Sequence, residues 1–125
     1  MRKEDLCDKI TLNKDIALAR LDKKETETDM YTIYVVFKCF EGKREAFVDA
    51  VRREGILDAV RAEDGCRRYD YYYSESDPCE LLLIEEWETK GHQEIHITQP
   101  HMARLREIKG DYIISTTLGE FEIKG

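Results

Sequence analysis

The sequence has few of the residues that most often mark a specialised site. Its 125 residues include only three histidines, one tryptophan and two prolines. No apolar run approaches the roughly 20 residues of a membrane-spanning helix. Residues 1–15 carry acidic side chains where a signal peptide would need an apolar segment. We therefore expect a soluble, cytoplasmic protein with no membrane partner.

A surplus of positive charge and the usual nucleotide-binding motifs are also missing. The formal net charge is −7 at pH 7, so we expect no basic face for nucleic acid or an anionic membrane. Neither a GxGxxG nor a GxxxxGK motif occurs. The four cysteines are scattered without a CxxC pair, which favours reduced thiols over a disulfide or a metal site.

The length suits one domain, preceded by an extension at residues 1–30. In this extension, charged and polar residues surround a thin apolar set, which predicts a short helix over about 15–24. The run at 25–29 has no periodicity, as expected of a linker. The domain proper is therefore placed at 31–125.

Strand and helix patterns alternate through this domain. Gly55 predicts a break in a long helical pattern, because glycine costs about 1 kcal/mol inside a helix. Thr89 suits a helix N-cap, Pro100 a first helical position and Gly110 a helix end. The expected elements are strands at 31–40, 66–75, 79–88 and 111–123, and helices at 43–64, 89–97 and 100–110. This β-α-β-β-α-β order predicts a ferredoxin-like α+β fold, a four-stranded antiparallel sheet with helices on one face.

Two of the predicted strands are apolar on both faces. These are YTIYVVF at 31–37 and LLLI at 81–84. Helices can cover only one face of the sheet, and a large apolar patch does not stay exposed on a soluble monomer. The strands therefore predict a homodimer that packs sheet to sheet and closes a dimeric α/β barrel.

Two segments resemble one protein family. AEDGCRRYDYY at 62–72 is similar to a Glu-x-Gly-Cys-x-x-Tyr motif that begins the family's second strand. IEEWETKGHQEIHITQPHM at 84–102 matches Glu-x-Trp, a histidine nine residues on and a Pro-His pair, here Glu85, Trp87, His96, Pro100 and His101. From 30 to 123 the chain resembles the antibiotic biosynthesis monooxygenase family, and His92 with KGD at 109–111 resembles its quinol monooxygenase branch.

This resemblance implies a dimeric α/β barrel and, for the quinol branch, an oxygenase with no cofactor. The haem-degrading branch typically has an asparagine in its first strand, which YTIYVVFKCF lacks. The same scaffold also carries a phospho-sugar-like isomerase, so proton transfer on a small hydroxyketone is an alternative. In that case Arg104 and Arg106 are candidates to hold a phosphate. A non-catalytic dimer that binds an apolar small molecule is the third hypothesis.

All three histidines follow the single tryptophan within fifteen residues, which predicts a pocket there. Together they could form a metal site, but HQEIH lacks the glutamate placement of HExxH, so we do not favour a metal. We expect His96 or His101 to face the pocket as a neutral base, because imidazole titrates near neutral pH. The predicted catalytic residues are therefore His96 and His101.

The predicted substrate-binding residues are Trp87, Glu85, Tyr34, Tyr71 and Tyr73. Glu85 points the same way as Trp87 and needs a buried partner, such as an arginine, a tyrosine hydroxyl or a histidine. Trp87 would form one wall of a flat aromatic site, and a tyrosine hydroxyl would hold a substrate oxygen.

The leading hypothesis is a monooxygenase that oxidises a quinol- or phenol-like molecule with O₂ and uses no metal, flavin or haem. A deprotonated quinol can pass an electron to oxygen directly. The protein then supplies a dry cavity between sheet and helices, a base, and donors that stabilise the developing oxyanion.

Overall fold

The computed structural model describes residues 30–120. Its elements, in chain order, are β2 (Tyr31–Cys39), α2 (Arg44–Arg53), α3 (Ile56–Arg61), β3 (Cys66–Tyr73), β4 (Glu80–Trp87), α4 (Lys90–His96), α5 (Pro100–Lys109) and β5 (Ile113–Glu120). The helix predicted over 15–24 lies outside the described residues. Within them, no helix has the length and apolar character needed to cross a membrane.

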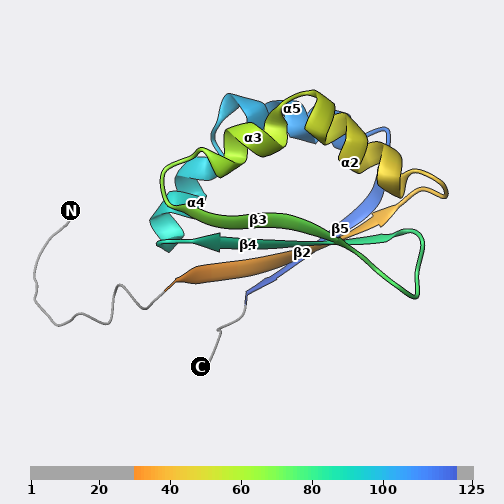
Figure 1. Ribbon diagram of the computed structural model, residues 1–125, viewed down its shortest axis with the longest axis horizontal. Helices are drawn as coiled ribbons and strands as arrows, with labels where there is room; N and C mark the ends of the chain where they lie inside the picture. Colours follow the sequence, from red (N-terminus) through yellow and green to blue (C-terminus); the bar gives the residue numbers. More distant parts are fainter. Residues whose placement is uncertain (1–29, 121–125) are drawn as a thin grey trace, which may run out of the picture. The chain divides into compact units, whose positions relative to one another are not determined.

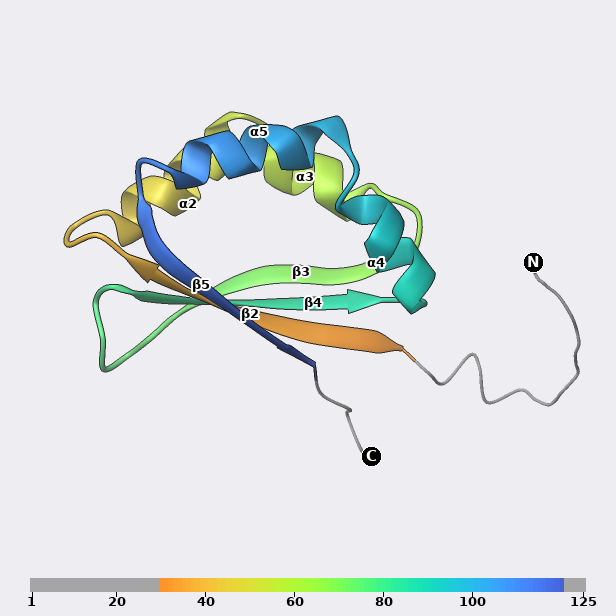
Figure 2. The ribbon, with the colours of Figure 1, turned by 180° about the vertical axis from the view of Figure 1, so that it is seen from behind.

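The strands form one antiparallel sheet in the order β3-β4-β2-β5. β2 pairs with both β4 and β5, and β4 pairs with β3 on its other side. Figures 1 and 2 show α2, α3 and α5 over one face of this sheet, and no described helix over the other. The ferredoxin-like fold predicted from the order of elements is confirmed.

The core lies between the sheet and the helices. Buried and half-buried residues alternate along β2 and β4, so each strand turns every second side chain toward the helices. Phe47 of α2 lies among aromatic rings, with its centroid 5.6 Å from Phe37 and 6.1 Å from Tyr71. A third ring, that of Tyr112, lies 6.0 Å away. Tilted and edge-on contacts of this kind stabilise the packing of α2 on the sheet.

The long helical pattern is broken where glycine predicted a break. Gly55 adopts φ +77°, a left-handed conformation, between the end of α2 and the start of α3. A side chain other than glycine is strained there. The break gives two short helices whose directions differ, as Figure 1 shows.

The predicted helix ends are also confirmed. The side chain of Thr89 accepts a hydrogen bond from the His92 backbone N–H at 3.2 Å, which caps α4. Pro100 is the first residue of α5, and Gly110 follows its last. α4 and α5 are therefore separate helices joined by a tight turn.

We call the sheet face that points away from the helices the open face. It carries a central apolar strip. β2 contributes Tyr34 and Val36, which pair across strands with Ile84 and Leu82 of β4, and all four are partly exposed. Polar side chains flank the strip. Two of them, Arg68 and Glu86, form an ion pair, and the remaining ones are Lys38, Asp70 and Thr117.

Gly65 forms the turn into β3 and lies against α4. Its φ is +85°, and a Cβ atom built on it would lie 2.4 Å from the His92 ring. Its carbonyl also accepts a hydrogen bond from the Glu88 backbone N–H at 2.8 Å. Both the backbone conformation and the space therefore require glycine at this turn.

Gly65→Ala should destabilise the protein by about 2–3 kcal/mol, because left-handed strain adds to a clash with the His92 ring. Gly42→Ala is the matched control, since φ is +75° but nothing lies within 4 Å of a Cβ there. The control should cost about 1 kcal/mol from backbone strain alone. Urea unfolding of both variants measures the difference. Equal losses would contradict the close approach of Gly65 to His92.

Candidate functional site

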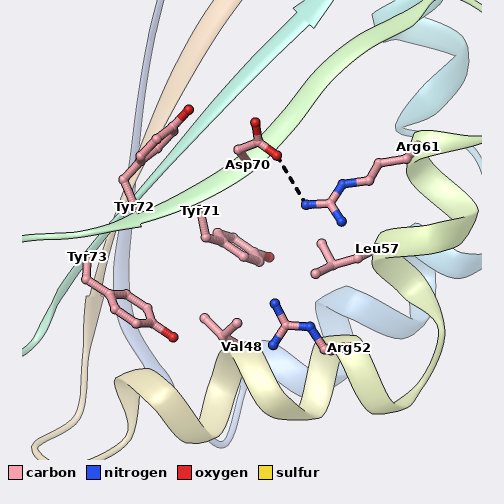
Figure 3. A pocket seen from close by; sticks show the side chains of 8 residues that line it. All are labelled: Val48, Arg52, Leu57, Arg61, Asp70, Tyr71, Tyr72 and Tyr73. Carbon is pink, nitrogen blue, oxygen red and sulfur yellow. Dashed lines mark hydrogen bonds and ion pairs between the residues drawn. The ribbon is translucent and has the colours of Figure 1, made fainter.

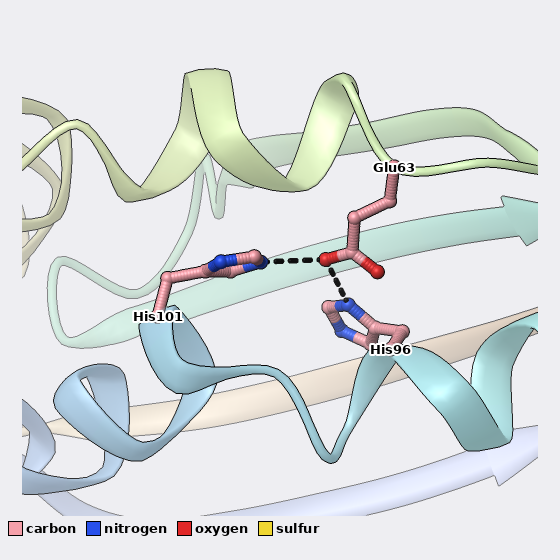
Figure 4. Close-up of side chains that lie close together, drawn as sticks. All are labelled: Glu63, His96 and His101. Atoms are coloured by element: carbon pink, nitrogen blue, oxygen red, sulfur yellow. Dashed lines mark hydrogen bonds and ion pairs between the residues drawn. The ribbon is translucent and has the colours of Figure 1, made fainter.

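Two predicted catalytic histidines meet one glutamate. Nδ1 of His96 lies 2.9 Å from Oε2 of Glu63, and Nε2 of His101 lies 2.6 Å from the same oxygen. His96 comes from the end of α4, His101 from the first turn of α5, and Glu63 from the loop between α3 and β3 (Figure 4). We call the two histidines together with the glutamate that joins them the bridged histidine pair, a set of three residues: Glu63, His96 and His101.

Local structure places each member of the pair. Backbone bonds from Glu63 N–H to the Val60 carbonyl and from Cys66 N–H to the Glu63 carbonyl hold the loop after α3. The α4–α5 turn is closed by a bond from the Gln99 N–H to the His96 carbonyl, at 3.1 Å. The turn brings both imidazoles to the same carboxylate oxygen, as Figure 4 shows.

The shared oxygen determines which ring nitrogens carry protons. An ionised carboxylate can only accept, so His96 donates from Nδ1 and His101 donates from Nε2. In the neutral state, the basic nitrogens are therefore Nε2 of His96 and Nδ1 of His101. His96 is buried to 1% exposure, while the side chain of His101 is 21% exposed. Of the two histidines, His101 is the one that solvent or a ligand can reach.

The other face of His96 meets Glu85 and Trp87. The indole N–H of Trp87 donates to Oε1 of Glu85 at 3.0 Å, and Nε2 of His96 lies 3.9 Å from that oxygen. The Trp87 and His96 ring centroids are 4.6 Å apart. The hydrogen-bond partner of Glu85 is thus the indole, which was not among the partners expected. A histidine, which was expected, lies just beyond hydrogen-bond length.

Burial shifts the acid–base properties of these groups. Desolvation raises the pKa of Glu85 to about 7, against a smaller lowering by the Trp87 hydrogen bond. Desolvation lowers the pKa of His96, and the hydrogen bond and charge of Glu63 act in the opposite direction. Both shifts favour the neutral form of the group concerned, as expected where burial dominates.

The bridged histidine pair also has the donors of a metal site. One nitrogen from each histidine and a carboxylate oxygen lie within 4.8 Å of one another. Two imidazoles and a carboxylate suit Zn²⁺ or Fe²⁺. Ligands bound at about 2.05 Å in a tetrahedron lie about 3.3 Å apart, which is longer than the 2.6 and 2.9 Å contacts here. These contacts are hydrogen-bond lengths.

A pocket of about 360 Å³ opens between β3 and the α2–α3 helices (Figure 3). Its lining residues are Val48, Arg52, Leu57, Arg61, Asp70, Tyr71, Tyr72 and Tyr73. The hydroxyl of Tyr71 is buried and has no hydrogen-bond partner among residues 30–120. We call this space the tyrosine pocket.

A single aromatic ring connects the tyrosine pocket with the bridged histidine pair. Tyr69 is fully buried, with its ring centroid 6.3 Å from that of Tyr71 and 5.7 Å from that of His96. Nε and Nη2 of Arg61 both donate to the Tyr69 carbonyl, at 3.1 and 2.9 Å. The pocket and the histidines are thus neighbouring parts of one region of the covered face.

The structure brings together some of the predicted site residues. His96, His101, Glu85 and Trp87 converge: the two histidines share one Glu63 oxygen, and Trp87 contacts both His96 and Glu85. Tyr71 and Tyr73 line the neighbouring tyrosine pocket. Tyr34 lies on the open face against Gly119, away from all of these.

Other residues have roles that the sequence did not predict. Glu63 was part of a recognised motif but had no assigned function. Arg104, a candidate phosphate ligand, instead binds Glu54 at 2.9 Å and Glu107 at 2.9 Å. Nη1 of Arg106 donates to the Ile97 carbonyl at 3.4 Å. Neither arginine is directed to an anion site beside His101.

The fold agrees with the family comparison. The model of the antibiotic biosynthesis monooxygenase family matches residues 30–108. The chain therefore belongs to the antibiotic biosynthesis monooxygenase family. All members of the bridged histidine pair, together with Glu85 and Trp87, lie inside this match.

Individual relatives support the same assignment. The "Probable quinol monooxygenase YgiN" of Escherichia coli (strain K12) is 30% identical over 79 residues, which cover 56% of this chain and 74% of that protein. The structure of Rv0793 from Mycobacterium tuberculosis has a TM-score of 0.65 at 26% identity, covering 78% of this chain and 97% of that one. PA3566 from Pseudomonas aeruginosa shares the fold, with a TM-score of 0.68 at 21% identity and coverage of 77% and 95%.

Trp87 is the only tryptophan, so its fluorescence should report the ionisation of Glu85. We expect a change in emission with a midpoint near pH 7, which Glu85→Gln removes. The unfolding free energy should fall as pH rises from about 4.5 to about 7, because over this range the unfolded chain ionises Glu85 and the folded chain does not.

Glu86→Gln is the matched control for this titration. Glu86 is the next residue but lies on the open face, paired with Arg68 at 3.2 Å. Its variant should keep the transition. Emission from the Glu85→Gln protein that still titrates near pH 7 would assign the change to another group.

Proposed function

We propose that this protein is a monooxygenase that oxidises a quinol- or phenol-like aromatic molecule with O₂ and needs no metal, flavin or haem. The observation that carries the proposal is the bridged histidine pair: two imidazoles fixed by one carboxylate, one ring away from a pocket lined by tyrosines. Membership of a monooxygenase family supports the reaction class.

The reaction balances without a cofactor. A quinol and O₂ give a hydroxyquinone and water, so one oxygen atom enters the ring and the other leaves as water. The quinol supplies all the electrons. Deprotonation comes first, because the quinolate anion gives an electron to O₂ far more readily than the neutral quinol does. The protein therefore has to take up a proton and stabilise an anion.

The residues divide these tasks. His101 accepts the proton at Nδ1, since Nε2 is held by Glu63 and the side chain is partly exposed. Glu63 orients both imidazoles, and its negative charge stabilises the imidazolium that forms. His96 positions Glu63 from the buried side. Tyr71, in the neighbouring pocket, is the candidate donor to a substrate oxygen, because its buried hydroxyl has no hydrogen-bond partner among residues 30–120.

His101→Gln should lower quinol-dependent oxygen uptake by about 100-fold or more, because a positioned general base typically contributes that factor. An oxygen electrode measures the rate with pure protein and a series of quinols in air. His92→Gln is the matched control: His92 contacts Thr89 at 2.8 Å, outside the bridged histidine pair, and its variant should keep most of the activity.

Two outcomes would contradict the proposal. Wild-type oxygen uptake equal to that of buffer across the quinol series would remove the activity itself. Equal rates for the His101→Gln and His92→Gln proteins would leave oxidation in place but remove His101 from the mechanism.

We also propose that the cytoplasmic form is a homodimer joined at the open face. The apolar strip of Tyr34, Val36, Leu82 and Ile84 is uncovered by any described helix. Burying such a strip against a second copy removes apolar surface from water at about 25 cal/mol per Å². A two-fold contact would use the same strip on both protomers.

Ile84→Lys should convert the dimer to a monomer, because it places a charge at the centre of that strip. Light scattering coupled to size exclusion measures the mass. Ile95→Lys is the control, since Ile95 is 60% exposed on α4 and lies outside the open face. A wild-type monomer, or a dimer in both variants, would refute the proposed interface.

A further inference from the structure

We infer that the tyrosine pocket selects an aromatic acid, a quinol- or phenol-like ring that carries a carboxylate. This substrate class rests on the proposed function for its oxidation, but the recognition itself depends only on binding. The inference depends on two side chains of the pocket, Arg52 and Tyr71, neither of which has a polar partner among residues 30–120.

Arg52 is unlike the other arginines of the described chain. Arg44, Arg53, Arg61, Arg67, Arg68 and Arg104 each bind a carboxylate, and Arg106 binds a backbone carbonyl. Within residues 30–120, no hydrogen bond or ion pair engages the guanidinium of Arg52. In a chain with a net charge of −7, carboxylates are plentiful, so this free cation is notable.

The unpaired charge lies at the pocket. Figure 3 shows the guanidinium of Arg52, from the end of α2, directed toward the space beside Val48 and Tyr71. The second cation there, Arg61, is already occupied by Asp70 at 3.2 Å and by the Tyr69 carbonyl. Asp70 is thus balanced, and Arg52 leaves the pocket with one positive charge in excess.

The buried hydroxyl gives the pocket a second recognition element. Tyr71 is an unsatisfied donor at the inner side of the pocket, and burial raises its pKa, so the hydroxyl keeps its proton. A hydrogen bond from a protonated phenol suits a ring hydroxyl or phenolate. The apolar side chains of Val48 and Leu57 line the pocket on either side of these two polar groups, as Figure 3 shows.

The arrangement matches one ligand chemistry. A planar ring can lie along Val48 and Leu57, present a hydroxyl to Tyr71 and direct a carboxylate to Arg52, which binds it with two parallel N–H donors. A volume of about 360 Å³ fits a ligand of one or two rings. A quinol without a charged group would leave the guanidinium unpaired.

Calorimetric titration with three probes tests the inference. The probes are 2,5-dihydroxybenzoate, its neutral isostere 2,5-dihydroxybenzamide, and hydroquinone. Wild-type protein should bind the acid about tenfold or more tightly than the amide, since a charged hydrogen-bond pair typically contributes at least this factor. Arg52→Gln should reduce the acid-to-amide ratio to about one.

Arg53→Gln is the matched control. Arg53 is the neighbouring arginine of α2, pairs with Asp49 and does not line the pocket. Its variant should keep the full preference for the acid. Tyr71→Phe should weaken the acid and the amide alike, because both present the same ring hydroxyl. Thermal unfolding of each variant checks that the fold is intact.

The outcomes separate this inference from the proposed function. Equal affinity for acid and amide, no binding of the acid at millimolar concentration, or a preference that survives Arg52→Gln would overturn the inference. If hydroquinone is oxidised in any of those cases, the proposed function still holds. An Arg52-dependent preference without any oxygen uptake would support the inference and refute the oxidation.

Discussion

One carboxylate oxygen holds the candidate site of this protein together. Oε2 of Glu63 accepts from an imidazole of α4 and from another of α5, so three separate chain segments meet at a single atom. Without it, two ring N–H groups would lose their partners in a largely buried place, at a cost of about 1–3 kcal/mol each. These hydrogen bonds therefore fix α4 and α5 to the loop after α3, and they hold His96 against Trp87.

Successive side chains of β4 point alternately toward the helices and toward the open face, which separates the candidate site from the surface ion pair. Glu85 and Trp87 face the helices, while Glu86 between them faces outward and pairs with Arg68. A shift of one residue in the pairing of β4 would exchange these groups. The register with β2, which sets Trp87 opposite Tyr31 and Leu81 opposite Phe37, therefore decides which carboxylate is buried and acquires a pKa near 7.

The fold could be predicted well from the sequence, and the site only in part. The spacing of apolar residues and the helix-end residues Thr89, Pro100 and Gly55 reflect local backbone preferences. They therefore predict the helices and strands and their order. Glu63 meets His96 from 33 residues away through a loop, and no spacing rule connects them. The sequence could not place Tyr34 on the open face, because a strand that is apolar on both faces does not reveal which face the helices cover. Whether rings enclose a hollow or touch depends on packing that a residue pattern does not contain.

The break at Gly55 has an evolutionary consequence. Arg52 precedes it on α2 and Leu57 follows it on α3, so residues from both sides of the bend line the tyrosine pocket. Glu63 follows the far end of α3, and His96 and His101 lie on α4 and α5. Exchanges near Gly55 can therefore alter the lining of the tyrosine pocket without replacing a member of the bridged histidine pair.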